Sequence, residues 1–153
     1  LKKYIRSGDI MNKELKREII LDGYQNPYHK QDINDKNFIK INTNNESCID
    51  NLDIYFKIEQ NIIKDVYFNG EACAISTSAT SIMLKKLVGK TIEQAKILLE
   101  NYKNMINEQP YDSNLLGELN VYYEIYLQPN RKNCALLPGK AIERLIKRLE
   151  DEN

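Results

Sequence analysis

The spacing of hydrophobic residues changes in the middle of this chain, and no other feature limits the possible folds as strongly. Over residues 52–58 apolar and polar residues alternate, which places the apolar side chains on one face of a half-buried β-strand. Residues 62–68 form a second run rich in β-branched and aromatic residues. Residues 59–61 can turn the chain between the two runs, so the sequence predicts a β-hairpin.

Helical spacing dominates the sequence on both sides of this hairpin. Residues 91–94 have the form of a capping box and predict a helix that continues to about residue 108. The last helix is predicted from about residue 135 to residue 149, which would put Pro138 in its first turn, where proline is tolerated. The remaining predicted elements are a helix at 12–24, an edge strand at 38–41, a helix at 75–87 and a short helical insertion at 115–126. This order predicts an α+β fold, with a small antiparallel sheet packed against several helices.

The length of the chain favours one domain. A sequence of 153 residues lies within the range in which a single hydrophobic core grows before chains divide. Met11 stands directly before the first helical pattern. We therefore interpret residues 11–153 as one domain and residues 1–10 as an N-terminal extension.

Charge and composition exclude several classes of partner. Lys and Arg together number 22 and are balanced by 22 Asp and Glu, so the chain has no bulk field to attract nucleic acid or an anionic membrane. No segment approaches the roughly 18 apolar residues that span a bilayer. Three cysteines are too few, and odd in number, for a disulfide framework. A cytoplasmic protein without nucleic-acid or membrane partners is the resulting expectation.

The three cysteines stand at the boundaries of predicted elements. Cys73 directly precedes the helix at 75–87, and Cys134 directly precedes the last helix. At a helix N-terminus the macrodipole and the free N–H groups favour the thiolate. Cys48 lies in a polar stretch before the hairpin, and Asp50 follows it by two residues. If these boundaries converge, three sulfurs and one carboxylate make a tetrahedral set for zinc or a partial set for iron.

Each cysteine taken alone can also be a small buried hydrophobic residue. No pair has the Cys-x-x-Cys spacing that makes a metal prediction from sequence strong. His29, the only histidine, lies in a polar loop where a lone histidine is usually solvated. The residues themselves therefore leave the metal site and ordinary packing both open.

Several segments resemble the motifs of one family. Residues 70–76, Gly-Glu-Ala-Cys-Ala-Ile-Ser, resemble the Gly-x-Gly-Cys-Ala-Ile-Ser segment of the U-type iron–sulfur cluster assembly proteins, which include IscU, SufU and the N-terminal domain of NifU. Residues 20–27 look like the end of that family's first helix. Residues 48–50 and 131–135 are similar to its Cys-Gly-Asp motif and its last cysteine segment, although Ile49 stands where the motif has glycine.

Two further traits resemble the SufU branch of that family. A segment beginning with residues 116–119, Leu-Gly-Glu-Leu, is similar to the Leu-Gly-Asp-Leu insertion of SufU. Asn133 stands directly before the last cysteine, where IscU has histidine.

The resemblance implies an IscU-like α+β fold with zinc held by Cys48, Asp50, Cys73 and Cys134. It implies that Cys48 receives sulfur as a persulfide from a SufS-type cysteine desulfurase and that downstream iron–sulfur assembly proteins are further partners. Arg131 matches an arginine of the family motif, which would hold anionic sulfur or contact the partner. As an arginine at a helix start, it is equally well interpreted as a solvated side chain.

Two other functions fit the same residues. The first is a scaffold that uses iron and builds a [2Fe–2S] cluster on the same cysteines. The second is a purely structural zinc-binding module, whose cysteines only hold the fold together. The interpretation as a sulfur acceptor would make the protein a zinc-dependent sulfurtransferase that works with a desulfurase. The sequence does not decide whether the protein is an enzyme.

Overall fold

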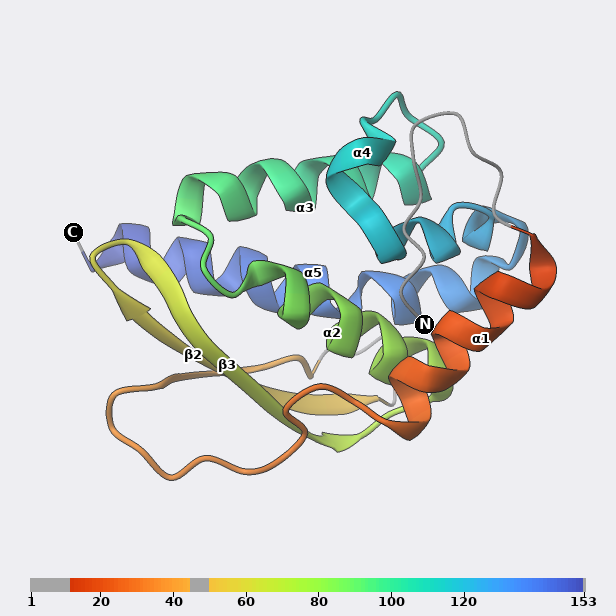
Figure 1. The fold of residues 1–153 in the computed structure, drawn as a ribbon. Helices are drawn as coiled ribbons and strands as arrows, with labels where there is room; N and C mark the ends of the chain where they lie inside the picture. Colours follow the sequence, from red (N-terminus) through yellow and green to blue (C-terminus); the bar gives the residue numbers. More distant parts are fainter. Residues whose placement is uncertain (1–11, 45–49, 153) are drawn as a thin grey trace.

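The computed structural model describes residues 12–44 and 50–152, which form an α+β fold around a three-stranded antiparallel sheet (Figure 1). The predicted extension at 1–10 lies outside these residues. The strands are β1 (Ile39–Asn42), β2 (Asn51–Glu59) and β3 (Ile62–Glu71), in the order β1-β2-β3. The α-helices are α1 (Lys13–Gln25), α2 (Ala74–Leu87), α3 (Ile92–Ile106), α4 (Ser113–Leu116) and α5 (Pro129–Asp151). The prediction of fold class is confirmed.

The central hairpin forms where the alternating pattern predicts it. Strands β2 and β3 pair in antiparallel register, with Glu59 opposite Ile62. The two residues between them, Gln60 and Asn61, both have positive φ, at 52° and 63°. Positive φ at both central residues is the conformation of the two-residue turn whose twist matches that of the flanking strands. A short turn therefore fixes the register of the sheet.

The outer edge of β3 is covered by the segment that follows α1. Phe68 donates its backbone N–H to the carbonyl of His29, and Gln31 donates to the carbonyl of Phe68. The His29 ring stacks between Tyr28 and Tyr67, and its Nδ1 donates to a backbone carbonyl of β3 at 2.8 Å. The His29 side chain is thus partly exposed, at 34%, and packs against one side of the sheet edge rather than standing free in the loop.

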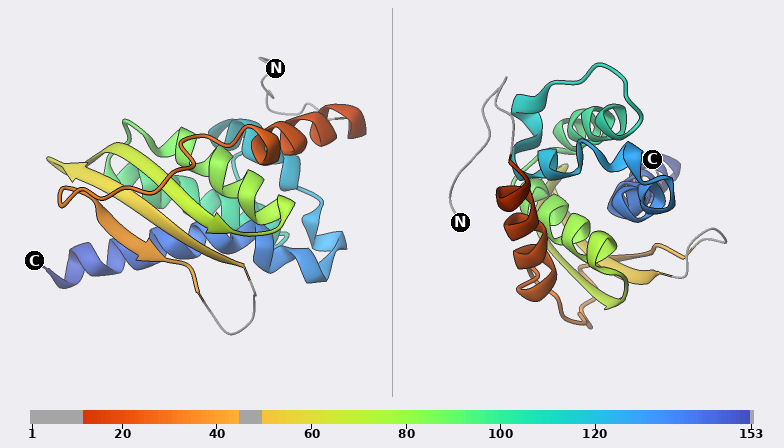
Figure 2. Two further views of the ribbon diagram at one scale, coloured as in Figure 1. Left: turned by 90° about the horizontal axis from the view of Figure 1, so that it is seen from below. Right: turned by 90° about the vertical axis from the view of Figure 1, so that its right-hand side faces the viewer.

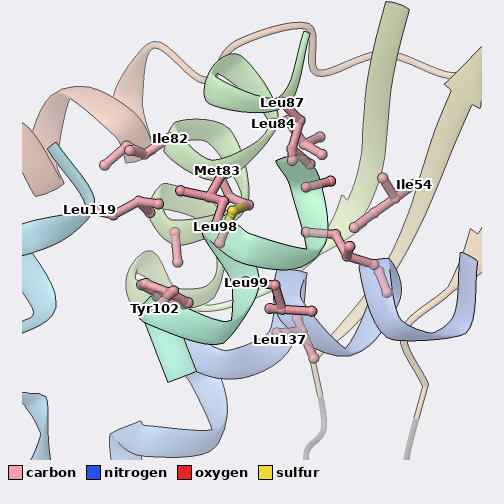
Figure 3. Close-up of a cluster of buried hydrophobic side chains, with 14 of the residues drawn as sticks. Ile54, Ile82, Met83, Leu84, Leu87, Leu98, Leu99, Tyr102, Leu119 and Leu137 are labelled. Atoms are coloured by element: carbon pink, nitrogen blue, oxygen red, sulfur yellow. The ribbon is translucent and has the colours of Figure 1, made fainter. Parts of the chain in front are cut away.

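Helix α2 runs through the middle of the domain, where residues 76–84 are all buried. The sheet lies on one side of it, α1 packs beside it, and α3 and α5 lie across it (Figures 1 and 2). Gly23 of α1 lies directly against Ser78, where a Cβ on the glycine would be 3.0 Å from the serine Cβ. Figure 3 shows Met83 of α2 among side chains of neighbouring elements, including Leu98 of α3. Apolar packing thus fixes α2 relative to every other layer.

The insertion differs from its prediction. Residues 113–127 form the single-turn helix α4 and two short 3-10 segments, η1 (Gly117–Tyr122) and η2 (Ile125–Leu127), rather than one helix. Gly117, at φ 51°, ends the first piece. The insertion still packs inward, because Tyr122 is buried and its hydroxyl lies 2.5 Å from the Ser78 hydroxyl.

Helix α5 also differs from its prediction, because it begins earlier. It starts at Pro129, which suits a first helical position, so Cys134 lies in the second turn and Pro138 lies inside the helix. Tertiary packing against α3 holds the helix together here, since Tyr102 donates its hydroxyl to the Ala135 carbonyl at 2.7 Å. Among the described residues, no helix is both long and apolar enough to cross a bilayer.

Candidate metal centre

Three of the four predicted ligands meet at one place in the structure. Asp50 lies directly before β2, Cys73 directly before α2, and Cys134 in the second turn of α5. One carboxylate oxygen and the two sulfurs all lie within 4.8 Å of one another. The fourth predicted ligand, Cys48, lies outside the described residues. The convergence that the sequence left open is therefore confirmed for these three side chains.

Cys73 is the N-cap residue of α2. Its backbone is extended, with φ −68° and ψ 170°, and its Sγ accepts a hydrogen bond from the backbone N–H of Ser76 at 3.4 Å. The side chain of an N-cap residue normally satisfies one of the free N–H groups of the first turn. The prediction that Cys73 stands at a helix N-terminus is confirmed, and the helix holds this sulfur in place.

Asp50 is buried, with 7% of its surface exposed. Its Oδ1 accepts the backbone N–H of Cys73 at 3.0 Å, and its Oδ2 accepts the hydroxyl of Ser76 at 2.6 Å. A buried carboxylate is costly unless hydrogen bonds or an opposite charge compensate it. The first turn of α2 therefore holds the carboxylate and the Cys73 sulfur as one rigid unit.

Cys134 comes to the cluster from α5 and is also 7% exposed. Its pKa is raised to about 11, above all by burial and then by its hydrogen bond with Cys73, while Ser76 and Arg131 act in the opposite direction. The prediction that Cys134 stands at a helix N-terminus is wrong. Because the field of a helix end fades within the first turn, desolvation decides the state of this thiol.

Arg131 lies in the first turn of α5, three residues before Cys134. The pKa of its guanidinium is raised, first by a hydrogen bond with Cys134 and also by the charge of Cys73. Its side chain is exposed and lies near both sulfurs, so the role of this arginine toward sulfur or a partner stays a prediction. The positive charge of Arg131 acts to lower the pKa of Cys134, against the larger effect of burial.

Ser76 is the residue of this site to which the sequence assigned no role. It contacts Asp50 through its hydroxyl and Cys73 through its backbone N–H. One signal was present, because Ser76 stands three residues after Cys73, the spacing at which an N-cap side chain meets a backbone N–H. That spacing predicts the contact to sulfur, whereas the contact to Asp50 depends on the sheet.

The donor set fits zinc. Zinc takes thiolate and carboxylate ligands in four-coordinate sites, and the described residues supply two sulfurs and one carboxylate. Soft sulfur ligands also suit iron in iron–sulfur chemistry, while magnesium and calcium prefer oxygen ligands alone. Cys73, Asp50 and Cys134 would hold such an ion, with one position left for a further ligand.

Comparisons with known proteins found relatives that are similar over most of the chain. Over 140 residues the chain is 33% identical to the zinc-dependent sulfurtransferase SufU of Bacillus subtilis (strain 168), which covers 91% of this chain and 94% of the relative. It is 30% identical over 105 residues to the iron–sulfur cluster assembly scaffold protein IscU of Thermotoga maritima, covering 69% of this chain and 74% of the relative.

A solved structure gives the same result for the fold. The crystal structure of FiSufU from Fervidobacterium islandicum AW-1 matches with a TM-score of 0.71 at 33% identity, covering 82% of this chain and 92% of that one. Residues 15–148 match the model of the NifU-like N-terminal domain. Since this match spans most of the sequence, the chain belongs to the family of the NifU-like N-terminal domain.

Proposed function

We propose that this protein works in iron–sulfur cluster assembly as a zinc-bound acceptor of sulfur from a cysteine desulfurase. The observation that carries the proposal is the cluster of Asp50, Cys73 and Cys134 within 4.8 Å. The relative from Bacillus subtilis, named a zinc-dependent sulfurtransferase, supports the choice of zinc. The proposed partners are a SufS-like desulfurase and downstream iron–sulfur assembly proteins in the cytoplasm.

Each side chain has a proposed role. Asp50, Cys73 and Cys134 hold zinc, and Cys48 is both its fourth ligand and the sulfur acceptor. When bound, zinc keeps its thiol ligands deprotonated, including Cys134, whose burial otherwise favours the neutral form. Arg131 provides the positive charge beside the sulfurs.

The transfer itself is a thiol–disulfide type exchange. The thiolate of Cys48 attacks the outer sulfur of the persulfide on the desulfurase, forming a new S–S bond. The S–S bond of the desulfurase persulfide breaks, and its cysteine leaves as a thiolate. No electrons enter or leave, so the step needs no separate oxidant or reductant.

A scaffold that builds a [2Fe–2S] cluster is the second candidate. Its support is the relative named as a scaffold and the affinity of iron for thiolates. Asn133, directly before Cys134, is exposed and offers no imidazole to such a cluster. The only histidine, His29, lies at the edge of the sheet, where its Nδ1 donates to a backbone carbonyl of β3. The described residues of the site therefore supply two sulfurs and one carboxylate, without a histidine.

The third candidate, a purely structural zinc module, makes a different prediction about folding. The described residues bury a continuous apolar core that runs through α2, α3 and α5. A core of this kind does not need a metal in order to form. We expect circular dichroism to show a folded chain after zinc is removed with a chelator, whereas a structural module would unfold.

Sulfur transfer to Cys48 is the experiment that tests the proposal. The zinc-loaded protein is mixed with a SufS-type desulfurase and cysteine, and peptide masses are measured without reductant. We expect one added sulfur atom on the peptide that contains Cys48, and none in a Cys48→Ser variant that still folds. Sulfur found only on other cysteines, or none at all, would contradict the relay.

Anaerobic reconstitution with iron and sulfide separates relay from scaffold. A stable coloured cluster in stoichiometric amount would favour the scaffold. A protein that keeps its zinc and forms no such cluster is the result that the relay predicts.

A further inference from the structure

We propose that Ser76 is a positioning residue of the metal centre, which orients the Asp50 carboxylate and the Cys73 sulfur together. The inference rests on the proposed zinc site, and it assigns a role to a residue that is not itself a ligand. Its basis is that one residue of α2 contacts two ligands through two different groups.

The two contacts come from separate parts of Ser76. The backbone N–H donates to Cys73 Sγ at 3.4 Å, and the side-chain hydroxyl donates to Asp50 Oδ2 at 2.6 Å. A hydrogen bond from a hydroxyl to a carboxylate at this length is in the strong, charge-assisted class. The backbone contact is available to any residue at this position, so the specific contribution of serine is the hydroxyl.

The Ser76 hydroxyl has a single hydrogen, and the group that accepts it determines which further contacts the oxygen can make. Because that hydrogen is donated to Asp50, the lone pairs of the oxygen are free to accept from other groups. Cys73 Sγ lies 3.5 Å from this oxygen and is the donor of the contact between them. The hydroxyl of Ser76 therefore contacts two of the three described ligands, Asp50 and Cys73.

Burial makes this arrangement rigid. Ser76 has no exposed surface, and Asp50 is 7% exposed. In such surroundings a carboxylate that loses a donor is oriented less strictly, because little water is present to replace the bond. Residues that orient the ligands of a metal typically change its affinity 10- to 100-fold when they are removed.

The same helix offers a matched control. Ser78 is as fully buried as Ser76, and its hydroxyl also makes a short hydrogen bond, to Tyr122 at 2.5 Å. This bond joins α2 to the insertion and involves no ligand. Ser78→Ala therefore removes a buried hydroxyl from the same helix without a direct effect on the metal centre.

The test compares the zinc affinities of Ser76→Ala and Ser78→Ala by competition with a chromophoric chelator. For Ser76→Ala we expect a loss of about 10- to 100-fold, and for Ser78→Ala a change of less than about threefold. Cobalt(II) gives a second readout, because its visible bands report the ligand geometry. These bands should shift in Ser76→Ala and stay unchanged in Ser78→Ala.

The pair Ser76→Thr and Ser76→Val keeps the test decisive if the alanine variant folds poorly. The two side chains have nearly the same shape, and only threonine keeps the hydroxyl. Zinc affinity should be higher for Ser76→Thr than for Ser76→Val. In an Asp50→Ala background the effect of Ser76→Ala should become much smaller, since its main target is gone.

The outcomes distinguish this inference from the proposed function. A wild-type protein that binds no zinc would contradict the proposed function itself. A wild-type protein that binds zinc, with equal affinity losses and unchanged cobalt bands in Ser76→Ala and Ser78→Ala, would overturn the positioning role alone.

Discussion

Cys73 and Cys134 reach the same cluster from opposite surroundings. Cys73 is a half-buried N-cap residue whose sulfur accepts a backbone N–H. Cys134 is buried inside the second turn of α5, and its pKa is raised to about 11, chiefly by desolvation. The sequence predicts two equivalent thiols, because each stands near the start of a helical pattern. Their difference shows that a cysteine one turn inside a helix lies beyond the first-turn N–H groups, so that burial becomes the dominant influence on its pKa.

This difference suggests a division of labour within the centre. Cys73 moves with α2, as do the hydrogen bonds that hold Asp50. Cys134 arrives on a separate helix, which is tied to α3 by the bond from Tyr102 to the Ala135 carbonyl. The site is therefore preformed on the α2 side and completed by α5.

Replacing each thiol by serine should have the largest effect. We expect both Cys73→Ser and Cys134→Ser to lose zinc affinity by more than about 100-fold, because each removes a sulfur ligand. The free energies of unfolding of the two metal-free variants, measured by urea denaturation, should differ. Serine is a better N-cap than cysteine, so Cys73→Ser should be at least as stable as the wild type.

Cys134→Ser should instead lose about 1 kcal/mol, because it buries a hydroxyl in place of a thiol. The comparison would fail if the two metal-free variants had equal stabilities, or if either kept the zinc affinity of the wild type.

The rate of alkylation should give the next largest difference. In the metal-free protein we expect iodoacetamide to modify Cys73 at least about tenfold faster than Cys134 at pH 8, since the thiolate is the reactive form and Cys134 is buried. Peptide masses over time measure both rates in one sample. Faster modification of Cys134 would contradict its placement in α5.

The pH dependence of the metal-free protein follows from the same pKa. A thiol whose pKa is about 11 in the folded chain keeps its proton longer than in the unfolded chain, where the value is about 8.5. Its contribution to stability is full below pH ~8.5 and is lost as the pH rises toward 11. Urea denaturation should show this fall in the wild type and a smaller one in Cys134→Ala.

The smallest expected effect on zinc affinity concerns the hydrogen bond that ties α5 to α3. Tyr102→Phe removes the hydroxyl that donates to the buried Ala135 carbonyl, which should cost about 1–2 kcal/mol in the free energy of unfolding. Zinc affinity should fall by only about threefold, because the ligands remain. A control is Thr91→Ala, which removes the cap of α3 and should cost about 1 kcal/mol without changing zinc affinity. Equal losses of affinity in the two variants would contradict a role for Tyr102 in placing Cys134.

The sequence predicts well those features that depend on neighbouring residues. The turn at 59–61 needs only its own backbone, and the capping box at Thr91 needs only the first turn of α3, where both of its hydrogen bonds form. The N-cap position of Cys73 likewise depends only on residues close to it in the sequence. Local patterns therefore fix most of the fold that supports the site.

The start of α5 could not be predicted in this way. Pro138 normally ends or kinks a helix, so the sequence favours a helix that begins close to it. In the structure the helix begins at Pro129, and contacts with α3 support its first turns. Gly139 allows the close approach, because a Cβ there would lie 2.8 Å from Leu99 Cδ1. Contacts between α3 and α5, far apart in sequence, decide where Cys134 lies.

The metal centre also depends on contacts between segments that are far apart in the sequence. Asp50 and Cys73 belong to different elements, and only the pairing of β2 with β3 brings their segments together, with Asn51 opposite Glu71. The residues suggested the set of four ligands and the resemblance to a family supported it, while the role of the Ser76 hydroxyl became visible only with the fold.

X-ray absorption at the zinc edge of the purified protein tests the central claim most directly. With Asp50, Cys73, Cys134 and Cys48 as ligands, we expect about one zinc per chain. The spectrum should show a shell of sulfur at about 2.3 Å and one lighter ligand at about 2.0–2.2 Å. Cys134→Ser should lower the sulfur count by one. A shell of oxygen and nitrogen alone, or a sulfur count unchanged in Cys134→Ser, would contradict the account.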